Sequence, residues 1–329
     1  MAENGSFRLF ALNASAALGK RVAAALQCPL AAHEEREFED GEHKARPLDG
    51  VAGRDVYVLH SLHGEPGQSA NDKLCRLLFF IGALKDAGAA RVTAVTPYLC
   101  YGRKDRRTKP NDPVTTRYMA AMFESVGVDC VVTLEAHNPA AFENAFRCRT
   151  VALTGAPLFA DYVKAHLREE KLAVVSPDAG GMKRAENLRE ALEAALGRPV
   201  GKGLAEKHRS SGVVSGDLFT GDVAGATALV VDDLISTGGT LLRTAKAARA
   251  AGATRVIALV THGLFMHGAA DVIADPALDG IVVSDAVPPF RLPDAERNAK
   301  ITLSPAAPLL AEAIRRLHDN RALTDLMVV

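Results

Sequence analysis

Short apolar runs alternate with longer segments of helical periodicity through most of the 329 residues. In the first half, apolar runs at 55–62, 91–97 and 130–134 enclose helix-like segments at 72–87 and 115–126. Continuous apolar runs bounded by turn residues are typical of strands buried on both faces of a parallel sheet. Strands and helices that alternate in this way are joined by right-handed crossovers. The pattern therefore predicts an α/β fold with mostly parallel sheets flanked by helices.

The alternation begins with a strand at 7–12 and a helix at 15–26, and it resumes in the second half of the chain. The second half is predicted to contain strands at 172–176, 228–231, 256–261 and 280–283, and helices at 183–196 and 241–251. A chain of this length exceeds what one core usually supports, so we expect two domains, 1–152 and 153–304. An amphipathic helix begins near residue 305, and we expect this C-terminal segment, about 305–329, to pack on the first domain.

The two halves also resemble each other in sequence. Residues 84–95 match 248–259 as a helix end, a glycine and a buried strand, and 129–139 match 279–289. Two matches in the same order favour two domains of related topology. The alternative is that βαβ units look alike without any duplication.

The stretch from 228 to 240 carries the clearest chemistry. The apolar run is followed at once by Asp232 and Asp233, which we call the acid pair. Next comes the phosphate loop, which consists of Ser236, Thr237, Gly238, Gly239 and Thr240. Backbone N–H groups and a helix N-terminus at the carboxyl end of a strand bind anions, and glycine lets the backbone approach a phosphate. Because carboxylates accept sugar hydroxyls, we predict a sugar-phosphate site rather than a plain turn with two solvated acids.

Two further strand ends carry polar residues. Asp178 and the glycines after it stand between a buried strand and a helix, which suits a phosphate chain; the alternative is a tight turn with Asp178 as N-cap. His137 follows the strand at 130–134, where α/β sites collect polar groups. A structural histidine and a ligand-binding one are equally compatible with that position.

The segment 98–109, which we call the basic loop, contains Arg103, Lys104 and Asp105 among further bases and two tyrosines. This composition favours a nucleotide base and phosphates over a solvated face. Acidic and basic residues number 39 each, so neither the chain nor this short loop predicts a nucleic-acid partner.

Two polar segments admit either a functional or a plain interpretation. Phe38, Asp40 and Glu42 could hold adenine by stacking and by accepting from its amine, or they form an ordinary Asp-Gly turn. Lys207 and Arg209 lie in a segment, 202–209, that could close over a polyphosphate as a flexible loop or form an exposed hairpin.

Composition limits the cellular setting. Five scattered cysteines show no metal-type spacing, and their odd number fits a reducing compartment. No signal-peptide pattern and no membrane-length apolar run is present, so we expect a cytoplasmic protein without a membrane partner.

The phosphate loop resembles the ribose-5-phosphate loop of type I phosphoribosyltransferases and of ribose-phosphate diphosphokinases (PRPP synthetases). The ordered set of other segments, among them residues 71–74, 97–98, 261–265 and 283–288, resembles only the diphosphokinases. That resemblance implies two phosphoribosyltransferase-like domains. It also implies transfer of the β,γ-diphosphoryl group of Mg-ATP to the C1 hydroxyl of ribose 5-phosphate, which gives PRPP and AMP.

The resemblance further assigns roles to residues. It implies that Arg103, Lys104, Asp105 and His137 bind ATP, that Phe38, Asp40 and Glu42 hold the adenine of a neighbouring subunit, and that His137 and Asp178 serve the Mg²⁺ site. It assigns the acid pair and the phosphate loop to ribose 5-phosphate, and Lys207 and Arg209 to catalysis. A homo-oligomer, dimeric or larger, is therefore expected.

Several positions depart from the family pattern. Lys104 stands where glutamine is usual, Glu135 where aspartate is usual, and Ser236 where aspartate is common. Asn111 and Asp112 interrupt a region that in many members helps to bind regulatory phosphate and ADP. Two alternatives stay open: a phosphoribosyltransferase that consumes PRPP, and a non-catalytic PRPP-synthetase-like regulatory subunit.

Overall fold

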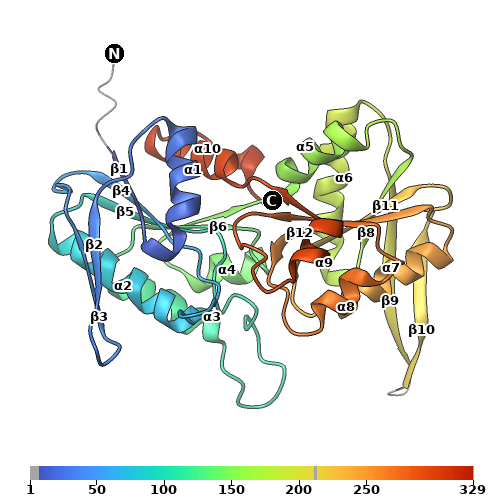
Figure 1. The fold of residues 1–329 in the computed structure, drawn as a ribbon, viewed down its shortest axis with the longest axis horizontal. Helices are drawn as coiled ribbons and strands as arrows, with labels where there is room; N and C mark the ends of the chain where they lie inside the picture. Colours follow the sequence, from blue (N-terminus) through green and yellow to red (C-terminus); the bar gives the residue numbers. More distant parts are fainter. Residues whose placement is uncertain (1–6, 211–212, 329) are drawn as a thin grey trace. The chain divides into compact units, whose positions relative to one another are not determined.

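The computed structural model describes residues 7–210 and 213–328. The chain forms two compact units (Figure 1). Unit 1 comprises Met1–Thr154 together with Ala307–Val329, and unit 2 comprises Gly155–Ala306. Each unit has its own sheet and its own core, so each is described separately.

Unit 1 is built on a five-stranded sheet with the order β1-β4-β5-β6-β7, in which all neighbours are parallel. Its strands are β1 (Phe7–Ala11), β4 (Asp55–Leu59), β5 (Arg91–Thr96), β6 (Cys130–Leu134) and β7 (Arg149–Leu153). The inner strands are almost fully buried, because helices cover both faces of the sheet.

Four helices connect the strands of unit 1: α1 (Ala16–Leu26), α2 (Ala70–Asp86), α3 (Thr115–Ser125) and α4 (Pro139–Ala145). On one face, Phe80 and Ile81 of α2 and Phe123 of α3 pack with alternate residues of the strands. A capping box between Ser69 and Asp72 fixes the start of α2.

The last helix of the chain, α10 (Ala307–His318), belongs to unit 1 and packs against α1. His318 Nδ1 lies 2.9 Å from Asp55 Oδ2, and Arg91 donates to the Leu317 carbonyl at 3.2 Å. The end of the chain is thus attached to the amino ends of β4 and β5. It also reaches β7, since Thr154 N donates to the Leu326 carbonyl of the short helix η3 (Thr324–Leu326) at 2.9 Å.

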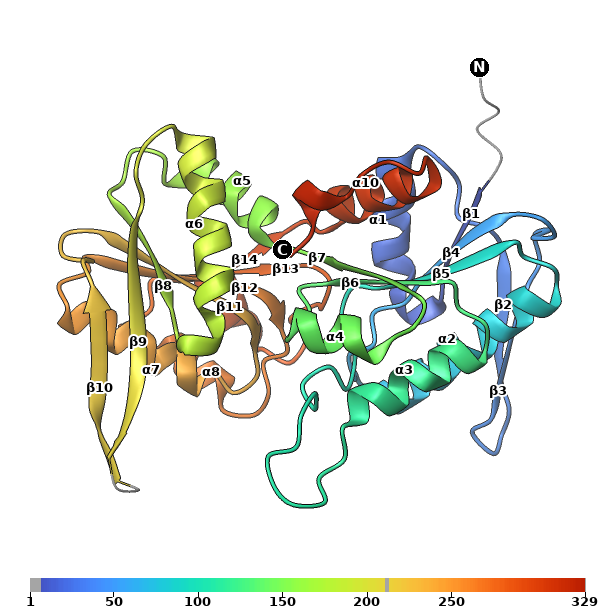
Figure 2. The same ribbon diagram turned by 180° about the vertical axis from the view of Figure 1, so that it is seen from behind.

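Unit 2 has a seven-stranded sheet with the order β10-β9-β8-β11-β12-β13-β14, which is parallel except at the β9–β10 pair. The strands are β8 (Leu172–Ser176), β9 (Gly201–Ser210), β10 (Val213–Gly221), β11 (Thr227–Ile235), β12 (Arg255–Gly263), β13 (Gly280–Ser284) and β14 (Ile301–Ser304). Helices α5 (Ala156–His166) and α6 (Met182–Leu196) pack on one face, and α7 (Gly239–Ala250) and α8 (Ala269–Ala274) on the other (Figure 2). Helix α9 (Asp294–Lys300) leads into β14.

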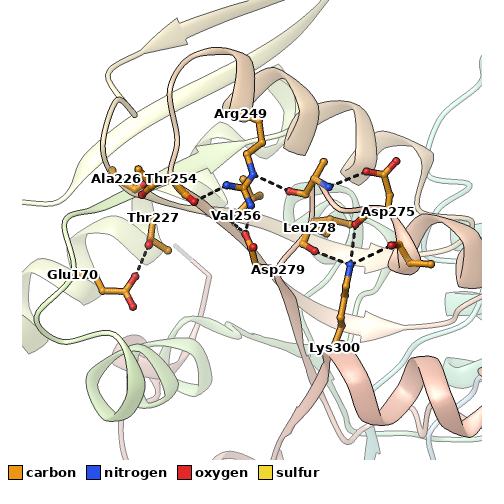
Figure 3. Close-up of polar contacts among 12 residues, drawn as sticks. Glu170, Ala226, Thr227, Arg249, Thr254, Val256, Asp275, Leu278, Asp279 and Lys300 are labelled. Carbon is orange, nitrogen blue, oxygen red and sulfur yellow. Dashed lines mark hydrogen bonds and ion pairs between the residues drawn. The ribbon is translucent and has the colours of Figure 1, made fainter.

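A carboxylate in unit 2 joins a helix end to the amino ends of two neighbouring strands (Figure 3). Asp279, just before β13, accepts from the guanidinium of Arg249 at the end of α7 and from Val256 N of β12 at 2.6 Å. Arg249 also donates to the Thr254 and Ala277 carbonyls. Beside this Asp279 bridge, the Lys300 ammonium donates to three carbonyls at and after the end of α8, as Figure 3 shows.

Unit 1 contains the same arrangement between α2, β5 and β6. Asp129, just before β6, accepts from Lys85 Nζ at 3.0 Å and from Val92 N at 2.7 Å. Lys85 is in the last turn of α2, as Arg249 is in the last turn of α7. We call this contact the Asp129 bridge.

The α/β prediction with parallel sheets flanked by helices is confirmed, but one local prediction was wrong, and at two segments the structure shows the plainer of the two interpretations. The acid pair was expected after its strand, whereas β11 continues through Ile235 because its backbone still pairs with β12 at Leu234 and Ile235. At Phe38, the Asp-Gly turn closes a hairpin formed by β2 (His33–Glu37) and β3 (His43–Pro47), two strands that were not expected. Of the two interpretations of 202–209, the structure shows the hairpin: the segment lies in strand β9, which pairs with both β8 and β10.

Candidate active site

The acid pair lies at the carboxyl end of β11, where the sheet of unit 2 opens on one side. β8 pairs with β11 only as far as Val230, so the next residues of β11 lack this neighbour. Asp233 is almost completely buried, and the Asp232 side chain is 23% exposed. Of the two carboxylates, that of Asp232 is therefore the more accessible to a ligand at this end of the sheet.

Arg184 is the basic residue that faces the acid pair, and sequence reasoning missed it. Its guanidinium nitrogens lie 3.5 Å from Asp232 Oδ1 and 3.8 Å from Asp233 Oδ1. Arg184 stands in the first turn of α6, where the helix dipole disfavours a cation. A base at such a position indicates an acidic partner, and that signal was available in the sequence.

Ionisation of both carboxylates of the acid pair is electrostatically unfavourable in this structure. Burial, followed by the neighbouring Asp233 carboxylate, raises the pKa of Asp232 to about 7, although Arg184 acts in the opposite direction. Two carboxylates this close favour a shared proton, a cation or hydroxyl donors between them. Sugar hydroxyls are donors of the required kind.

The phosphate loop turns directly from β11 into α7. Gly238 has a φ of +83°, and a Cβ at this position would lie 2.8 Å from Val272 Cγ1. Gly239, the first residue of α7, has no atom within 4 Å of a Cβ placed on it. No side chain caps α7, so the first N–H groups of the helix are available to an anion.

A second glycine turn follows β8, the neighbour of β11. Asp178 is exposed, and its Oδ1 accepts from Gly181 N at 2.9 Å. A Cβ on Gly181 would lie 2.8 Å from Ser176 Oγ, so any larger residue there would displace the Ser176 hydroxyl, which donates to the Asp178 carbonyl. Asp178 is thus the N-cap of the short helix η2 (Ala179–Gly181), as the plain interpretation predicted, and its position at the same sheet edge as the acid pair suits the functional one as well.

In unit 1, the basic loop follows β5 and is held by two neighbouring elements. Thr116 of α3 donates its hydroxyl to the Tyr101 carbonyl at 2.9 Å and to the Lys104 carbonyl at 3.1 Å. Asn138, after β6, donates to Asp105 Oδ2 at 2.7 Å. Lys104 also forms an ion pair of 2.6 Å with Asp112, which lies three residues after the loop. The structure therefore brings Lys104, Asp105 and the segment that carries His137 to one edge of the sheet.

His137 itself is exposed and immediately precedes Asn138, the N-cap of α4. Two residues earlier, Glu135 has a φ of +54° and is 6% exposed. Its N–H donates to the Leu153 carbonyl of β7 at 2.7 Å. This strained backbone carries the chain from β6 toward His137.

A buried polar cluster, not predicted from the sequence, supports the loop after β4. Lys73 of α2 is completely buried and lies 3.1 Å from Glu65 Oε1. His63 Nε2 approaches Glu65 Oε2 at 3.4 Å. His60 Nδ1 lies 3.0 Å from the hydroxyl of Ser15. Since β4 and β5 are neighbours, this cluster fixes a loop beside the basic loop.

The segment around Phe38 forms the turn of the β2–β3 hairpin. Phe38 N donates to the Glu42 carbonyl at 2.8 Å, and Glu42 N donates to Asp40 Oδ1 at 3.0 Å. The Phe38 ring is 38% exposed and faces the Arg36 guanidinium at 5.1 Å. The Asp-Gly turn is present, and an accessible aromatic ring stands on it.

Lys207 and Arg209 lie on β9, opposite Asp217 and Val214 of β10. Their side chains lie outside the described residues, so only their place on the hairpin is known. The structure brings the acid pair, the phosphate loop and Asp178 together in unit 2, and Lys104, Asp105 and His137 together in unit 1. Among the side chains that the structure describes, no group of three or more His, Cys, Asp or Glu is arranged to hold a metal, and none of the described helices has the length and apolarity needed to cross a membrane.

Comparison with known proteins places these features in one family. Residues 7–127 match the N-terminal domain of ribose phosphate pyrophosphokinase, and residues 213–328 match the phosphoribosyl synthetase-associated domain. The chain is 35% identical to ribose-phosphate pyrophosphokinase 1 of Streptococcus pyogenes over 97% of each protein. It is also 35% identical to the ribose-phosphate pyrophosphokinase of Hyphomonas neptunium, over 97% of this chain and 99% of that protein.

Structural comparison agrees with the sequence comparison. A crystal structure of phosphoribosylpyrophosphate synthetase from Mycobacterium smegmatis matches 96% of this chain and 99% of that chain, with a TM-score of 0.84 and 30% identity. These similarities extend over nearly the full length of the proteins compared. The chain belongs to the ribose-phosphate pyrophosphokinase family.

Proposed function

We propose that this protein is a ribose-phosphate diphosphokinase that converts Mg-ATP and ribose 5-phosphate into PRPP and AMP. The observation that carries the proposal is the acid pair beside an uncapped helix N-terminus at the carboxyl edge of a parallel sheet. That arrangement suits a phosphorylated sugar, and it lies in a chain whose whole length matches ribose-phosphate pyrophosphokinases.

Ribose 5-phosphate would bind in unit 2. The 5-phosphate would accept hydrogen bonds from N–H groups of the phosphate loop and the first turn of α7. Asp232 and Asp233 would accept the ribose hydroxyls, which stabilises the ionised form of Asp232. Arg184 would hold the carboxylates in place, since it already faces both of them.

ATP would use the groups of unit 1. Arg103 and Lys104 would bind its phosphates, with Asp105 and His137 beside them. Phe38, Asp40 and Glu42 would receive the adenine of a neighbouring subunit, which makes a homo-oligomer part of the proposal. The accessible Phe38 ring on the hairpin turn supports this role.

Mg²⁺ fits the donor chemistry of this proposal. Magnesium in nucleotide sites is usually held by one or two carboxylates plus substrate phosphates, so a complete protein cage is not required. Asp178 is exposed and supplies carboxylate oxygen, and His137 is the second candidate. When bound, the ion would neutralise charge on the transferring diphosphoryl group.

In the reaction, the C1 hydroxyl oxygen of ribose 5-phosphate bonds to the β-phosphorus of ATP and loses its proton. The bond from that phosphorus to the oxygen bridging to the α-phosphate breaks, and AMP leaves with this oxygen. Phosphoryl transfer depends mainly on positioning and charge compensation. Lys207 and Arg209 would supply positive charge at the transferring group, and the acid pair would fix the sugar.

The same proposal assigns one phosphoribosyltransferase-like domain to each unit. The expected boundary after residue 152 and the C-terminal segment from about 305 are supported by units that divide after Thr154 and before Ala307. A cytoplasmic location follows from the proposed metabolism.

The test is to incubate the protein with Mg-ATP and ribose 5-phosphate and to follow AMP by chromatography. We expect AMP to form only when ribose 5-phosphate is present, in a one-to-one ratio with PRPP. No AMP at any phosphate concentration would indicate a non-catalytic regulatory subunit. Consumption of added PRPP with a free nucleobase would indicate a phosphoribosyltransferase.

A further inference from the structure

Asp112 is the centre of the basic loop and its following turn. One of its carboxylate oxygens, Oδ2, accepts four hydrogen bonds. The donors are the Lys104 ammonium at 2.6 Å, the Thr108 hydroxyl at 2.8 Å, and the backbone N–H groups of Thr108 and Lys109, each at 3.0 Å. These bonds hold the pKa of Asp112 well below its usual range, so the carboxylate is ionised.

These four donors form the kind of site that binds a phosphate oxygen. Two successive backbone N–H groups, a hydroxyl and an ammonium converge on one point, as they do around bound phosphates. In this structure the anion at that point belongs to the protein itself. The side chains of Lys104 and Asp112 remain 32% and 23% exposed, so a dissolved anion can reach them.

The loop does not depend on this carboxylate alone for its shape. Thr116 holds the Tyr101 and Lys104 carbonyls, and Arg107 Nε donates to the Asp112 backbone carbonyl at 3.2 Å. The Asp112 N–H also donates to the Lys109 carbonyl at 3.2 Å. Replacement of the carboxylate by an amide should therefore keep the turn and remove the charge.

We propose that Asp112 competes with the nucleotide polyphosphate for the Lys104 ammonium and so lowers the affinity for ATP. The inference rests on the proposed function only in assigning Lys104 to the ATP phosphates. The Asp112 carboxylate acts as an internal substitute for a phosphate oxygen, and ATP must displace it from Lys104. Lysine at 104 and aspartate at 112 thus act as a pair that sets the nucleotide affinity.

A double-mutant cycle tests the proposal, with D112N, K104Q and the double variant compared to the wild-type protein. Two quantities are measured: the KM for ATP in the AMP assay, and the Kd for Mg-ATP by calorimetry without ribose 5-phosphate. We expect D112N to lower both by about threefold to fivefold, as expected for loss of one partly exposed ion pair. The gain in affinity for ATP that D112N causes should shrink at high salt, and it should vanish when Lys104 is also replaced by glutamine.

The control is D319N, which removes the same charge from an exposed residue of unit 1 just after α10. It should leave the ATP KM and Kd unchanged. An unchanged or raised Kd in D112N would overturn the proposal and make Asp112 a structural residue of the loop. An equal gain in the K104Q background would overturn it as well, since the effect would then not pass through Lys104.

The calorimetric arm separates this inference from the proposed function. If the wild-type protein forms no AMP, the proposed function fails, while the Kd for Mg-ATP still shows whether Asp112 competes. If the wild-type protein forms AMP and D112N binds Mg-ATP no more tightly, only the inference about Asp112 fails.

Discussion

The two units are alike at the amino ends of their strands and different at the carboxyl ends. At the amino ends, the Asp129 bridge and the Asp279 bridge connect equivalent helices and strands, each through a basic side chain in the last turn of a helix and a backbone N–H of a strand. In each bridge a glycine with positive φ separates the basic donor from the backbone donor: Gly88 at +84° and Gly252 at +94°. These positions lie in the two sequence segments that resemble each other.

At the carboxyl ends, the chemistry is opposite. Unit 2 presents an acid pair and an uncapped helix N-terminus, whereas unit 1 presents a basic loop held by its own carboxylate, Asp112. The comparison teaches that one scaffold presents two different sets of polar groups, and that the residues at and after the strand ends decide which ligand each edge suits. An acidic edge suits sugar hydroxyls, and a basic edge suits polyphosphate.

The largest effect is expected at Lys207, on the hairpin of unit 2. The change Lys207→Ala should lower kcat by about 10²–10³-fold and change the KM for ATP much less, because the charge is needed mainly in the transition state. Lys202→Ala, on the same strand and exposed, is the matched control and should keep wild-type kcat. Equal losses in kcat and in ATP affinity would assign Lys207 to ground-state binding instead.

The two glycines of the phosphate loop should respond differently to alanine. Gly238→Ala should destabilise unit 2 by about 2–4 kcal/mol, because a Cβ is strained at positive φ and meets Val272. Gly239→Ala should preserve stability, since its Cβ meets no atom, and should raise the KM for ribose 5-phosphate by blocking close approach. Thermal melting and the AMP assay separate the two effects. Equal melting temperatures for both variants would refute the strain at Gly238.

Stability should fall as pH rises through the titration of Asp232. Its pKa is raised to about 7 in the folded protein from an ordinary value of 3.8, so the folded state binds the extra proton between those values. The stabilising contribution is therefore complete below about pH 4 and lost as pH passes 7. We expect a loss of about 1–3 kcal/mol between pH 5 and 8, and Asp232→Asn should flatten this dependence. If the free energy of unfolding of the Asp232→Asn variant falls with pH as steeply as that of the wild type, Asp232 does not cause the pH dependence.

The smallest effects are expected at the two equivalent contacts, the Asp129 bridge of unit 1 and the Asp279 bridge of unit 2. Asp129→Asn and Asp279→Asn should each destabilise their unit by about 1 kcal/mol, because both carboxylates are about one-third exposed. Denaturant titration measures both values, and neither variant should change the KM of either substrate by more than about twofold. A large loss of stability in one variant and none in the other would contradict the structural equivalence of the two bridges.

Much of the scaffold could be predicted from the sequence because buried parallel strands give continuous apolar runs. Strands β5, β6, β8 and β13 were placed within one or two residues of their observed bounds. The glycine loops were also recognisable, since positive φ and close approach at residues such as Gly238 admit little else.

The β2–β3 hairpin could not be predicted, because its strands are mostly polar and are ordered by backbone pairing. β2, with the sequence His-Glu-Glu-Arg-Glu, contains no apolar residue, yet it pairs with β3 along its whole length. The same limit hid the Lys104–Asp112 pair and the buried Lys73–Glu65 pair. A sequence does not show which of many charged residues meet in space.

The most direct test of the account measures the KM for both substrates in the AMP assay for wild type and Asp233→Asn. The account predicts AMP release that requires ribose 5-phosphate. In the variant, it predicts at least about a tenfold rise in the KM for ribose 5-phosphate, with the KM for ATP nearly unchanged. A wild-type protein that releases no AMP, or a variant in which both KM values rise equally, would contradict the division of the two substrates between the two units.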